Sequence, residues 1–277
     1  MLSKKIDFAI IIKVKNANPN GDPLNGNRPR VNYDGFGEMS DVCLKRKIRN
    51  RLLDSGEAIL VQSDDYRNDE YRSIKDRYDG NENIAALGKN PASTDAVETA
   101  CKEWFDVRAF GQVLAFKKEK DEEKGISIPI RGPVSIQSAF SLETVVSESL
   151  QITKSVNLET NKKEPAQKGK DTIGQKHRIN QGIYVTYGSI NKQLAERTGF
   201  SDEDAAKLKK AISKMFENDE SSARPSGSME VDKVIWWTHS DKVISSAEVH
   251  RSLKVNDDGT YSLTAIDGVV AEEIDGQ

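Results

Sequence analysis

Residues 5–15 read KIDFAIIIKVK, in which β-branched and aromatic side chains form a run between polar ends. Such a run favours a β-strand and is long enough to cross a sheet. We therefore expect this segment to be the first strand of a central sheet. The elements that follow it decide which fold that sheet belongs to.

The loop after this strand, residues 16–30 (NANPNGDPLNGNRPR), is polar, bent and poor in acidic groups. Its Asn-Pro, Asn-Gly and Asp-Pro steps favour turns, because Asn and Gly tolerate positive φ and Pro fixes φ. A plain surface turn would have the same composition. Arg28 and Arg30, however, add two guanidiniums to the amides and backbone N–H groups, and this combination suits phosphate, ribose or base edges.

The composition limits the class of protein. The 277 residues suffice for one or two domains, 36% hydrophobic residues can fill a core, and 31% charged residues predict a soluble protein. No run reaches the ~20 apolar residues of a membrane span, and the N-terminus has no signal-peptide cleavage region. Cys43 and Cys101 lie far apart without a CxxC pair, so neither a disulfide framework nor zinc is indicated. We expect a cytoplasmic protein without a cofactor or bound metal.

Charge is segregated along the chain, although the net charge is only −3. Residues 41–51 hold five basic residues and one acidic residue, and residues 154–178 hold seven basic and three acidic ones. Residues 241–277, in contrast, hold three basic and eight acidic residues. A local cationic surface is therefore compatible with the acidic average, and the local field is what attracts a polyanion.

The first basic segment, SDVCLKRKIRNRLLDSG (residues 40–56), predicts a helix over residues 41–54. A serine or aspartate can cap its start, a glycine can end it, and apolar residues recur at helical spacing. Lys45, Arg46 and Arg49 then form a stripe of positive charge along the helix axis. A solvated helix face is the alternative, but such faces usually mix acidic with basic residues.

The middle of the chain contains a predicted insertion and further strands. Residues 62–100 are charged, mixed in sign and broken by Gly and Pro, which indicates an insertion with helical stretches. KEWFDVRAFGQVLAF (102–116) is strand-like, KKEKDEEKG (117–125) predicts an exposed loop, and ISIPIRGPVSIQSAFSLE (126–143) predicts another strand. Its Gly-Pro step interrupts the ladder, and Arg131 beside this break can point at a nucleic-acid backbone.

A basic hairpin is predicted from about residue 150 to residue 180. Its middle is polar and Lys-rich, whereas the sequences on either side alternate like a pair of strands. A flexible surface loop has the same composition, so both alternatives stay open. A few apolar side chains along the arms suit a partner contact or a wedge between bases. They are Ile152, Val156, Leu158, Ile173 and Ile179.

The C-terminal third predicts a helix and a strand. GFSDEDAAKLKKAISKMFEND (199–219) opens with a capping box and continues with one apolar face. A Gly/Pro/Ser turn, in which Arg224 is a candidate backbone contact, then precedes a strand over residues 231–239. We expect Trp236 and Trp237 to form the core and the surface of that strand rather than a base-stacking platform.

The predicted order is strand, basic helix, strand, strand with protrusion, helix and strand, which is the βαββαβ arrangement of a ferredoxin-like α+β domain. We expect one elaborated domain over residues 1–277, with insertions at about 60–100 and about 150–180. The RNA-recognition domain shares this layout, but its K/R-G-F/Y-G/A-F-V-x-F/Y signature is absent. RNA would then be held by loops and the basic helix.

Several segments together resemble a known family. The first strand with NPNGDPLNGNRPR, then DVCLKRKIRNRL, WFDVRAFG, IRGPVSIQSAFS, HRINQGIY and FENDESSARPSGSMEV, is similar to the backbone subunits of type I CRISPR Cascade complexes in the RAMP superfamily, most closely those of subtype I-C. The resemblance runs through nearly the whole chain in the same order. It implies an RRM-like palm, a helical web insertion and a thumb hairpin.

The resemblance also implies partners and contacts. Copies would stack head to tail along the CRISPR RNA spacer, each thumb kinking the guide, whose bases would stay open to pair with target DNA next to other Cascade subunits. A subunit that accepts any spacer cannot read bases, so backbone contacts should dominate. Carried onto matching positions, the RNA contacts would be Asn18, Asn20, Arg28, Arg30, Lys45, Arg46, Arg49, Arg131 and Arg224, with Lys170, Lys176, His177 and Arg178 on the hairpin.

Two other functions stay open. Relatives in the superfamily are ribonucleases, and His177 lies in a basic context near two tyrosines, so acid–base cleavage of CRISPR RNA or target RNA is chemically feasible. Asp22 or Asp34 would support metal-assisted cleavage, as a loop aspartate does in type III backbone subunits. The sequence has no His pair and no carboxylate cluster with ligand spacing, so we expect no enzymatic activity. A subunit that binds only protein would have no affinity for RNA.

Overall fold

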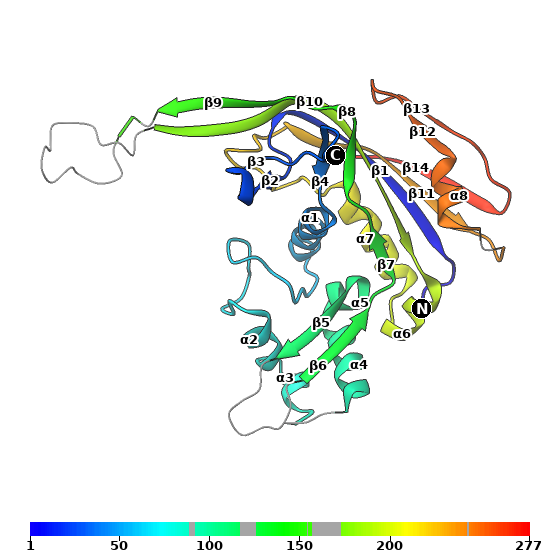
Figure 1. The fold of residues 1–277 in the computed structure, drawn as a ribbon. Coiled ribbons are helices and arrows are strands. Elements are labelled where there is room, and N and C mark those ends of the chain that lie inside the picture. The colour runs from blue at the N-terminus through cyan, green and yellow to red at the C-terminus, as the bar shows by residue number, and fades with distance from the viewer. Residues whose placement is uncertain (89–91, 117–125, 154, 157–172, 243) are drawn as a thin grey trace, which may run out of the picture.

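The structure is a computed structural model that describes residues 1–277 except 89–91, 117–125, 154, 157–172 and 243. It combines helices with a large antiparallel sheet in which β14, β11, β1, β10, β8 and β4 are neighbours in that order, while β7 and β9 also pair with β10 (Figure 1). The strands are β1 (Ile6–Ala17), β4 (Phe36–Met39), β7 (Val134–Ile136), β8 (Ala139–Thr144), β9 (Ser147–Thr153), β10 (Ile173–Ile190), β11 (Met229–His239) and β14 (Val269–Asp275).

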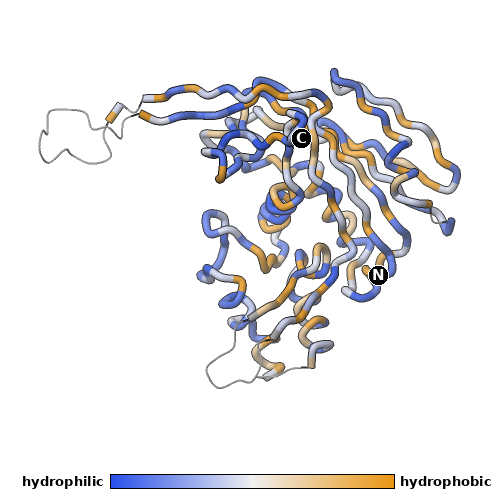
Figure 2. The backbone as a smooth tube through the Cα atoms, in the orientation of Figure 1, coloured by the Kyte–Doolittle hydropathy of each residue, from blue (hydrophilic) through white to orange (hydrophobic). Residues whose placement is uncertain are grey.

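The first predicted strand is confirmed as β1, which lies in the middle of the sheet between β10 and β11. Every residue from Ile6 to Ile12 is buried, because the sheet is covered on both faces. A strand buried on both faces reads as a continuous apolar run instead of an alternating one. In Figure 2, hydrophobic residues recur along the strands of the sheet that Figure 1 labels.

The main core lies on one face of the sheet, under helices α1 (Asp41–Asp54), α6 (Lys192–Thr198) and α7 (Asp202–Ser213). The predicted bounds of α1 are confirmed, and the Ser40 hydroxyl caps it by accepting a hydrogen bond from the backbone N–H of Cys43. The predicted capping box of α7, made by Ser201 and Asp204, is also present. Helix α6 was not predicted.

The opposite face is covered by α8 (Ser246–Arg251) and the hairpin of β12 (Leu253–Val255) and β13 (Tyr261–Leu263). The expectation that one of the two tryptophans faces solvent was therefore wrong. Trp236 packs in the main core and stacks on Phe8. Trp237 packs on the opposite face, in a hydrophobic cluster with Val249 and Leu253. The acidic C-terminal segment supplies the cover that buries Trp237.

The predicted insertion forms helices α2 (Ile74–Asp79), α3 (Glu82–Ala85) and α4 (Ser93–Glu103), which share a small core with α5 (Phe105–Phe110) and the two-stranded sheet of β5 (Gly111–Phe116) and β6 (Ile126–Arg131). The strand-like interpretation of residues 102–116 was wrong in its first half. That half forms the end of α4 and all of α5, and the buried Asp106 attaches α5 to the preceding segment by accepting hydrogen bonds from the backbone of Leu60 and Val61. The predicted loop at 117–125 lies outside the described residues.

The single strand expected over residues 126–143 is three strands in two sheets. β6 pairs with β5, whereas β7 and β8 pair with β10 in the main sheet. The predicted break at the Gly-Pro step is where the chain changes sheets. A Cβ at Gly132 would overlap with the backbone of Ala109 and Gly111, so the close crossing of these segments requires glycine.

The predicted hairpin is present in its described part. β9 pairs with β10 from Thr153 opposite Ile173 to Ser147 opposite Ile179, and this ladder projects away from the rest of the molecule (Figure 1). Ile152 and Ile173 are exposed on the arms, whereas Ile179 is buried in the main core. Leu158 and Lys170 lie outside the described residues. No helix in the described part is both long and apolar enough to cross a membrane.

Candidate nucleic-acid interface

The loop after β1 folds into a short ladder of β2 (Gly21–Asp22) and β3 (Arg28–Pro29), closed by the 3-10 turn η1 (Pro23–Asn25). Gly26 and Asn27 both have positive φ, at 60° and 59°. These are the residue types that adopt this conformation at low cost. The loop therefore has a defined shape, as its Asn, Gly and Pro content predicted.

Two asparagines fix this loop to the rest of the protein. The side-chain oxygen of Asn20 accepts hydrogen bonds from the backbone nitrogen (2.9 Å) and the hydroxyl (3.1 Å) of Ser40. Asn18 donates through its amide to the carbonyl of Asn27 (2.7 Å) and through its backbone to the carbonyl of Ala223 (2.9 Å). The side chain of Asn18 is buried, with 3% of the residue exposed. Both amides were predicted to face RNA, but in this structure they hold the loop in place.

The two arginines of the loop differ. Arg28 is exposed, and its side chain has no hydrogen bond or ion pair within the described residues. Arg30 is half-buried, and its Nη2 lies 3.6 Å from Oδ1 of Asp22. Its Nε is buried without a partner among the described residues. The loop therefore presents Arg28 as an uncompensated cation.

The bases of α1 do not form the unopposed stripe that the sequence predicts. Acidic groups from elsewhere in the fold neutralise several of them, and two acids, Asp41 and Asp54, come from the helix itself. The pairs are Lys45 with Asp41 at 3.0 Å, Arg46 with Asp65 at 3.9 Å, Arg49 with Asp106 at 2.9 Å, Arg51 with Glu217 at 3.3 Å, and Lys47 with Asp219. Of the predicted contacts on this helix, Arg46 has the most exposed side chain.

Arg49 has a structural role in this arrangement. Its Nε donates to the fully buried carboxylate of Asp106, and its guanidinium lies 5.1 Å from the ring centre of Phe110. Asp106 also accepts the two backbone hydrogen bonds that start the insertion. The i,i+4 spacing that places Arg49 beside Lys45 could not reveal this partner, which lies 57 residues further along the chain.

Asp219 brings two cations together, Arg224 and Lys47, and sequence reasoning missed this shared partner. Its Oδ2 accepts from Nε of Arg224 at 2.9 Å, and the same oxygen is the partner of the buried Lys47. Burial lowers the pKa of Lys47, while the charge of Asp219 opposes that shift. Burial likewise raises the pKa of the neighbouring Cys43 thiol. The carboxylate thus fixes Arg224 next to the middle of α1.

The structure brings part of the predicted set together. The hydrogen bonds above join the loop, the start of α1 and the turn that carries Arg224, and β3 lies against β10 near the base of the hairpin. Arg131 lies elsewhere: it is exposed and is the last residue of β6, the strand that pairs with β5 and is labelled in Figure 1. The hairpin residues form a third group.

On the hairpin, His177 and Arg178 have partners on the facing strand. Nδ1 of His177 lies 2.8 Å from the hydroxyl of Ser149, and Nε of Arg178 lies 3.3 Å from Oε2 of Glu148. The side chain of Lys176 has no hydrogen bond or ion pair within the described part of the chain. Across that part, no three His, Cys, Asp or Glu side chains are placed to hold a metal ion.

Comparisons with known proteins point to one family. Residues 4–270 match the model of the family "CRISPR-associated protein Cas7". The chain is 28% identical over 280 residues to the CRISPR-associated protein Cas7 of Haloferax volcanii, with 96% of this chain and 79% of that protein covered.

Two solved chains have a weaker likeness to the structure. One is from a "CRISPR RNA-guided surveillance complex, pre-nicking", with a TM-score of 0.48 and 16% identity over 88% of this chain and 81% of that chain. The other is from a "CRISPR RNA-guided surveillance complex", with a TM-score of 0.44 and 20% identity over 95% of this chain and 77% of that one. Neither likeness is strong enough to assign a role to this chain.

Proposed function

This chain belongs to the family of CRISPR-associated protein Cas7, and on that premise we propose that it is a non-catalytic CRISPR RNA-binding backbone subunit of a type I Cascade surveillance complex. The motifs quoted above favour subtype I-C. The subunit would coat the guide spacer and present it for pairing with target DNA in antiviral defence.

The observation that carries this proposal is the fixed loop after β1, which contains β2 and β3. Asn18 donates to the carbonyl of Asn27 and the amide oxygen of Asn20 accepts from Ser40, so the loop can present Arg28 without a large ordering cost. A preorganised cationic loop suits a ribose-phosphate backbone, which has the same chemistry for every spacer sequence. Arg30, Lys45, Arg46 and Arg224 would support it from the same side of α1.

The elements fit the parts expected of such a subunit. We assign the palm to the strands β11, β1, β10 and β8 with α1 and α7, because this set supplies a βαββαβ unit. The web corresponds to the insertion with α2, α3 and α4. The thumb corresponds to β9 and the outer half of β10, where Lys176, His177 and Arg178 would meet the guide. Its exposed Ile152 and Ile173 would act as a wedge between bases.

Assembly follows from the same role. Copies that contact one another head to tail form a ring only if the rotation between neighbours closes. Where it does not close, they extend along the RNA as a filament. Other Cascade subunits, large, small and guide-end-capping, would complete the complex. Arg131, which lies away from the loop, would contact a stretch of guide further along.

The test is binding of a fluorescent guide-length RNA and a scrambled RNA of equal length over a range of salt concentrations, with the bound species sized in the same experiment. We expect equal affinities, a steep salt dependence of about 0.7 per phosphate contact, and a ladder of multiply loaded species. One tight complex on one sequence, or no binding to either RNA, would overturn the proposal.

A ribonuclease is the alternative, and the same samples test it. RNA is incubated with the protein with and without magnesium, and its length is followed. Shortened RNA whose formation is abolished by His177→Ala or Asp22→Ala would replace the non-catalytic assignment by cleavage. Intact RNA in both conditions is the expected result.

A further inference from the structure

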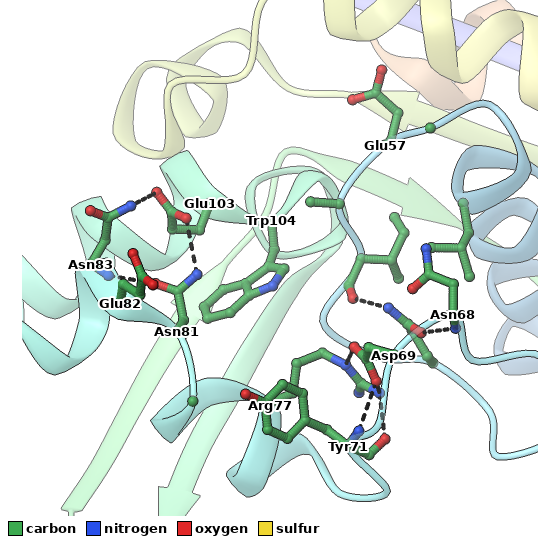
Figure 3. Close-up of a pocket in the computed structure, with 16 residues that line it drawn as sticks. Glu57, Asn68, Asp69, Tyr71, Arg77, Asn81, Glu82, Asn83, Glu103 and Trp104 are labelled. Atoms are coloured by element: carbon green, nitrogen blue, oxygen red, sulfur yellow. Dashed lines mark hydrogen bonds and ion pairs between the residues drawn. The ribbon is translucent and has the colours of Figure 1, made fainter.

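A pocket of about 590 Å³ lies in the insertion, away from the loop that carries Arg28. It is formed by the end of α1 and the segment that follows, by parts of α2 and α3, and by the end of α4 (Figure 3). Its volume is in the range of sites that bind small molecules or single side chains of a partner. The proposed RNA contacts do not line it.

Most polar groups of the pocket already have partners. The guanidinium of Arg77, the only basic group in the lining, donates to Asp69 at 2.6 and 2.8 Å and to the carbonyls of Leu60 and Tyr71, both at 2.8 Å. Glu57 is paired with Lys207, which lies outside the lining, at 2.8 Å. These groups therefore have little capacity left for a ligand.

Two carboxylates remain without a cation. Glu103 accepts the amides of Asn81 (3.0 Å) and Asn83 (2.9 Å), which hold its position but leave its charge uncompensated. Glu82 is exposed beside it and has no ion pair within the described residues. A pair of uncompensated carboxylates attracts a cationic group and repels phosphate.

Trp104 adds a second, independent indication of a ligand. The residue is 4% exposed and lines the pocket, yet its indole N–H has no acceptor within the described part of the chain. Most of the side chain is buried, but its N–H is not among the fully buried atoms, so this donor is open to a ligand that enters the pocket. Figure 3 shows the indole between Glu82 and Glu103 on one side and Asn68 on the other. A ligand that crosses the ring could supply an acceptor to the indole and a cation to the carboxylates.

We propose that this pocket binds an arginine or lysine side chain of a protein partner. The cationic head would lie against Glu82 and Glu103, and a carbonyl of the same peptide would accept from the indole N–H of Trp104. Charge-assisted hydrogen bonds to carboxylates are strong when the site is partly desolvated. RNA or DNA is a poorer occupant, since its phosphates would meet two uncompensated acids.

The experiment follows the indole N–H resonance of Trp104 in nitrogen-labelled full-length protein, assigned with Trp104→Phe. The probe is the peptide Ac-Gly-Arg-Gly-NH2, and the control peptide has glutamine in place of arginine. We expect a saturable shift of this resonance with the arginine peptide and none with the glutamine peptide. Equal shifts with both peptides, or no shift with either, would overturn the proposal.

Charge-neutral variants test the carboxylates. Glu82→Gln combined with Glu103→Gln should weaken binding of the arginine peptide on the order of tenfold. Glu196→Gln, an exposed glutamate on α6, is the matched control and should leave the affinity unchanged. Guanosine monophosphate is titrated in parallel. A saturable shift with the nucleotide but not with the peptide would assign the pocket to nucleic acid and reject a basic protein partner.

Discussion

The amide oxygen of Asn20 accepts two hydrogen bonds from Ser40, one from its backbone nitrogen at 2.9 Å and one from its hydroxyl at 3.1 Å. Ser40 is also the N-cap of α1, because its hydroxyl accepts from the backbone nitrogen of Cys43. The turn-rich loop and the basic helix are therefore fixed to each other through one side chain. This contact determines where the loop presents its backbone.

Asn20→Ala should weaken RNA binding without removing any charge. The loop would lose its contact with Ser40, and ordering it on RNA would then cost about 1 kcal/mol more. We expect an affinity lower by about fivefold, equally for all RNA sequences, and an unchanged salt slope. Asn25→Ala, an exposed position in the same loop, is the control. An effect of equal size in both variants would mean that the contact with Ser40 does not matter.

Arg28→Ala should reduce the affinity through charge alone. The side chain is exposed and has no partner within the described residues. Its removal should therefore change the free energy of unfolding by less than about 0.5 kcal/mol. If it contacts one phosphate, the slope of log affinity against log salt falls by about 0.7. The measurement is RNA binding at several salt concentrations, alongside urea unfolding. An unchanged slope would remove Arg28 from the interface.

Arg49→Ala should act on stability instead. It would leave the carboxylate of Asp106 buried without its cation, which costs about 3 kcal/mol or more. Urea unfolding measures this loss. The control is Arg72→Ala, which removes an exposed arginine 3.7 Å from Asp64 and should cost less than about 1 kcal/mol. Unchanged stability combined with a lower salt slope would return Arg49 to the RNA-binding set.

Asp7 gives the protein a predictable response to acid. Burial opposes its ionisation, but polar contacts with the nearby His250, Ser246 and His239, of which His239 lies 2.6 Å from Oδ2, and the charge of Lys5 outweigh burial and hold the pKa of Asp7 well below its usual range. A carboxyl whose pKa is lower in the folded state stabilises the protein above its unfolded pKa of about 3.9. That contribution is lost as the pH falls below this value.

Asp7→Asn should therefore be less stable than the wild type at pH 7, by about 3 kcal/mol. It should also lose less stability than the wild type between about pH 4 and pH 2, because the titrating group is gone. Urea unfolding across this range measures both effects. Asp34→Asn, at an exposed loop position, should follow the wild-type profile. Parallel pH profiles for Asp7→Asn and the wild type would contradict the assignment.

Local signals made much of the fold predictable. The apolar run that became β1, the capped helix α1 and the capping box of α7 each depend on residues a few positions apart, and all three are present. The Gly-Pro break after Arg131 was also predictable, since proline donates no hydrogen bond and glycine permits a close crossing. Features of this kind depend on residues that are close together in the sequence, so they can be predicted from it.

The candidate interface was only partly predictable. The sequence singled out the loop and the bases of α1, but it could not show that Asp106 and Asp219 neutralise Arg49, Lys47 and Arg224. Asp106 lies 57 residues from Arg49 and Asp219 lies 172 residues from Lys47, so neither acid has a local signature on α1. Composition alone therefore overestimated the free positive charge of α1.

By itself, the sequence determined the local elements and, through its ordered motifs, the family. Only the tertiary structure decided which charges are free, because ion pairs such as Arg49 with Asp106 depend on chain segments that meet after folding. It also decided that Trp237 is buried, since the cover comes from the acidic C-terminal segment. Burial and charge pairing are properties of three-dimensional neighbours, whereas strand and helix formation depend mainly on residues nearby in the chain.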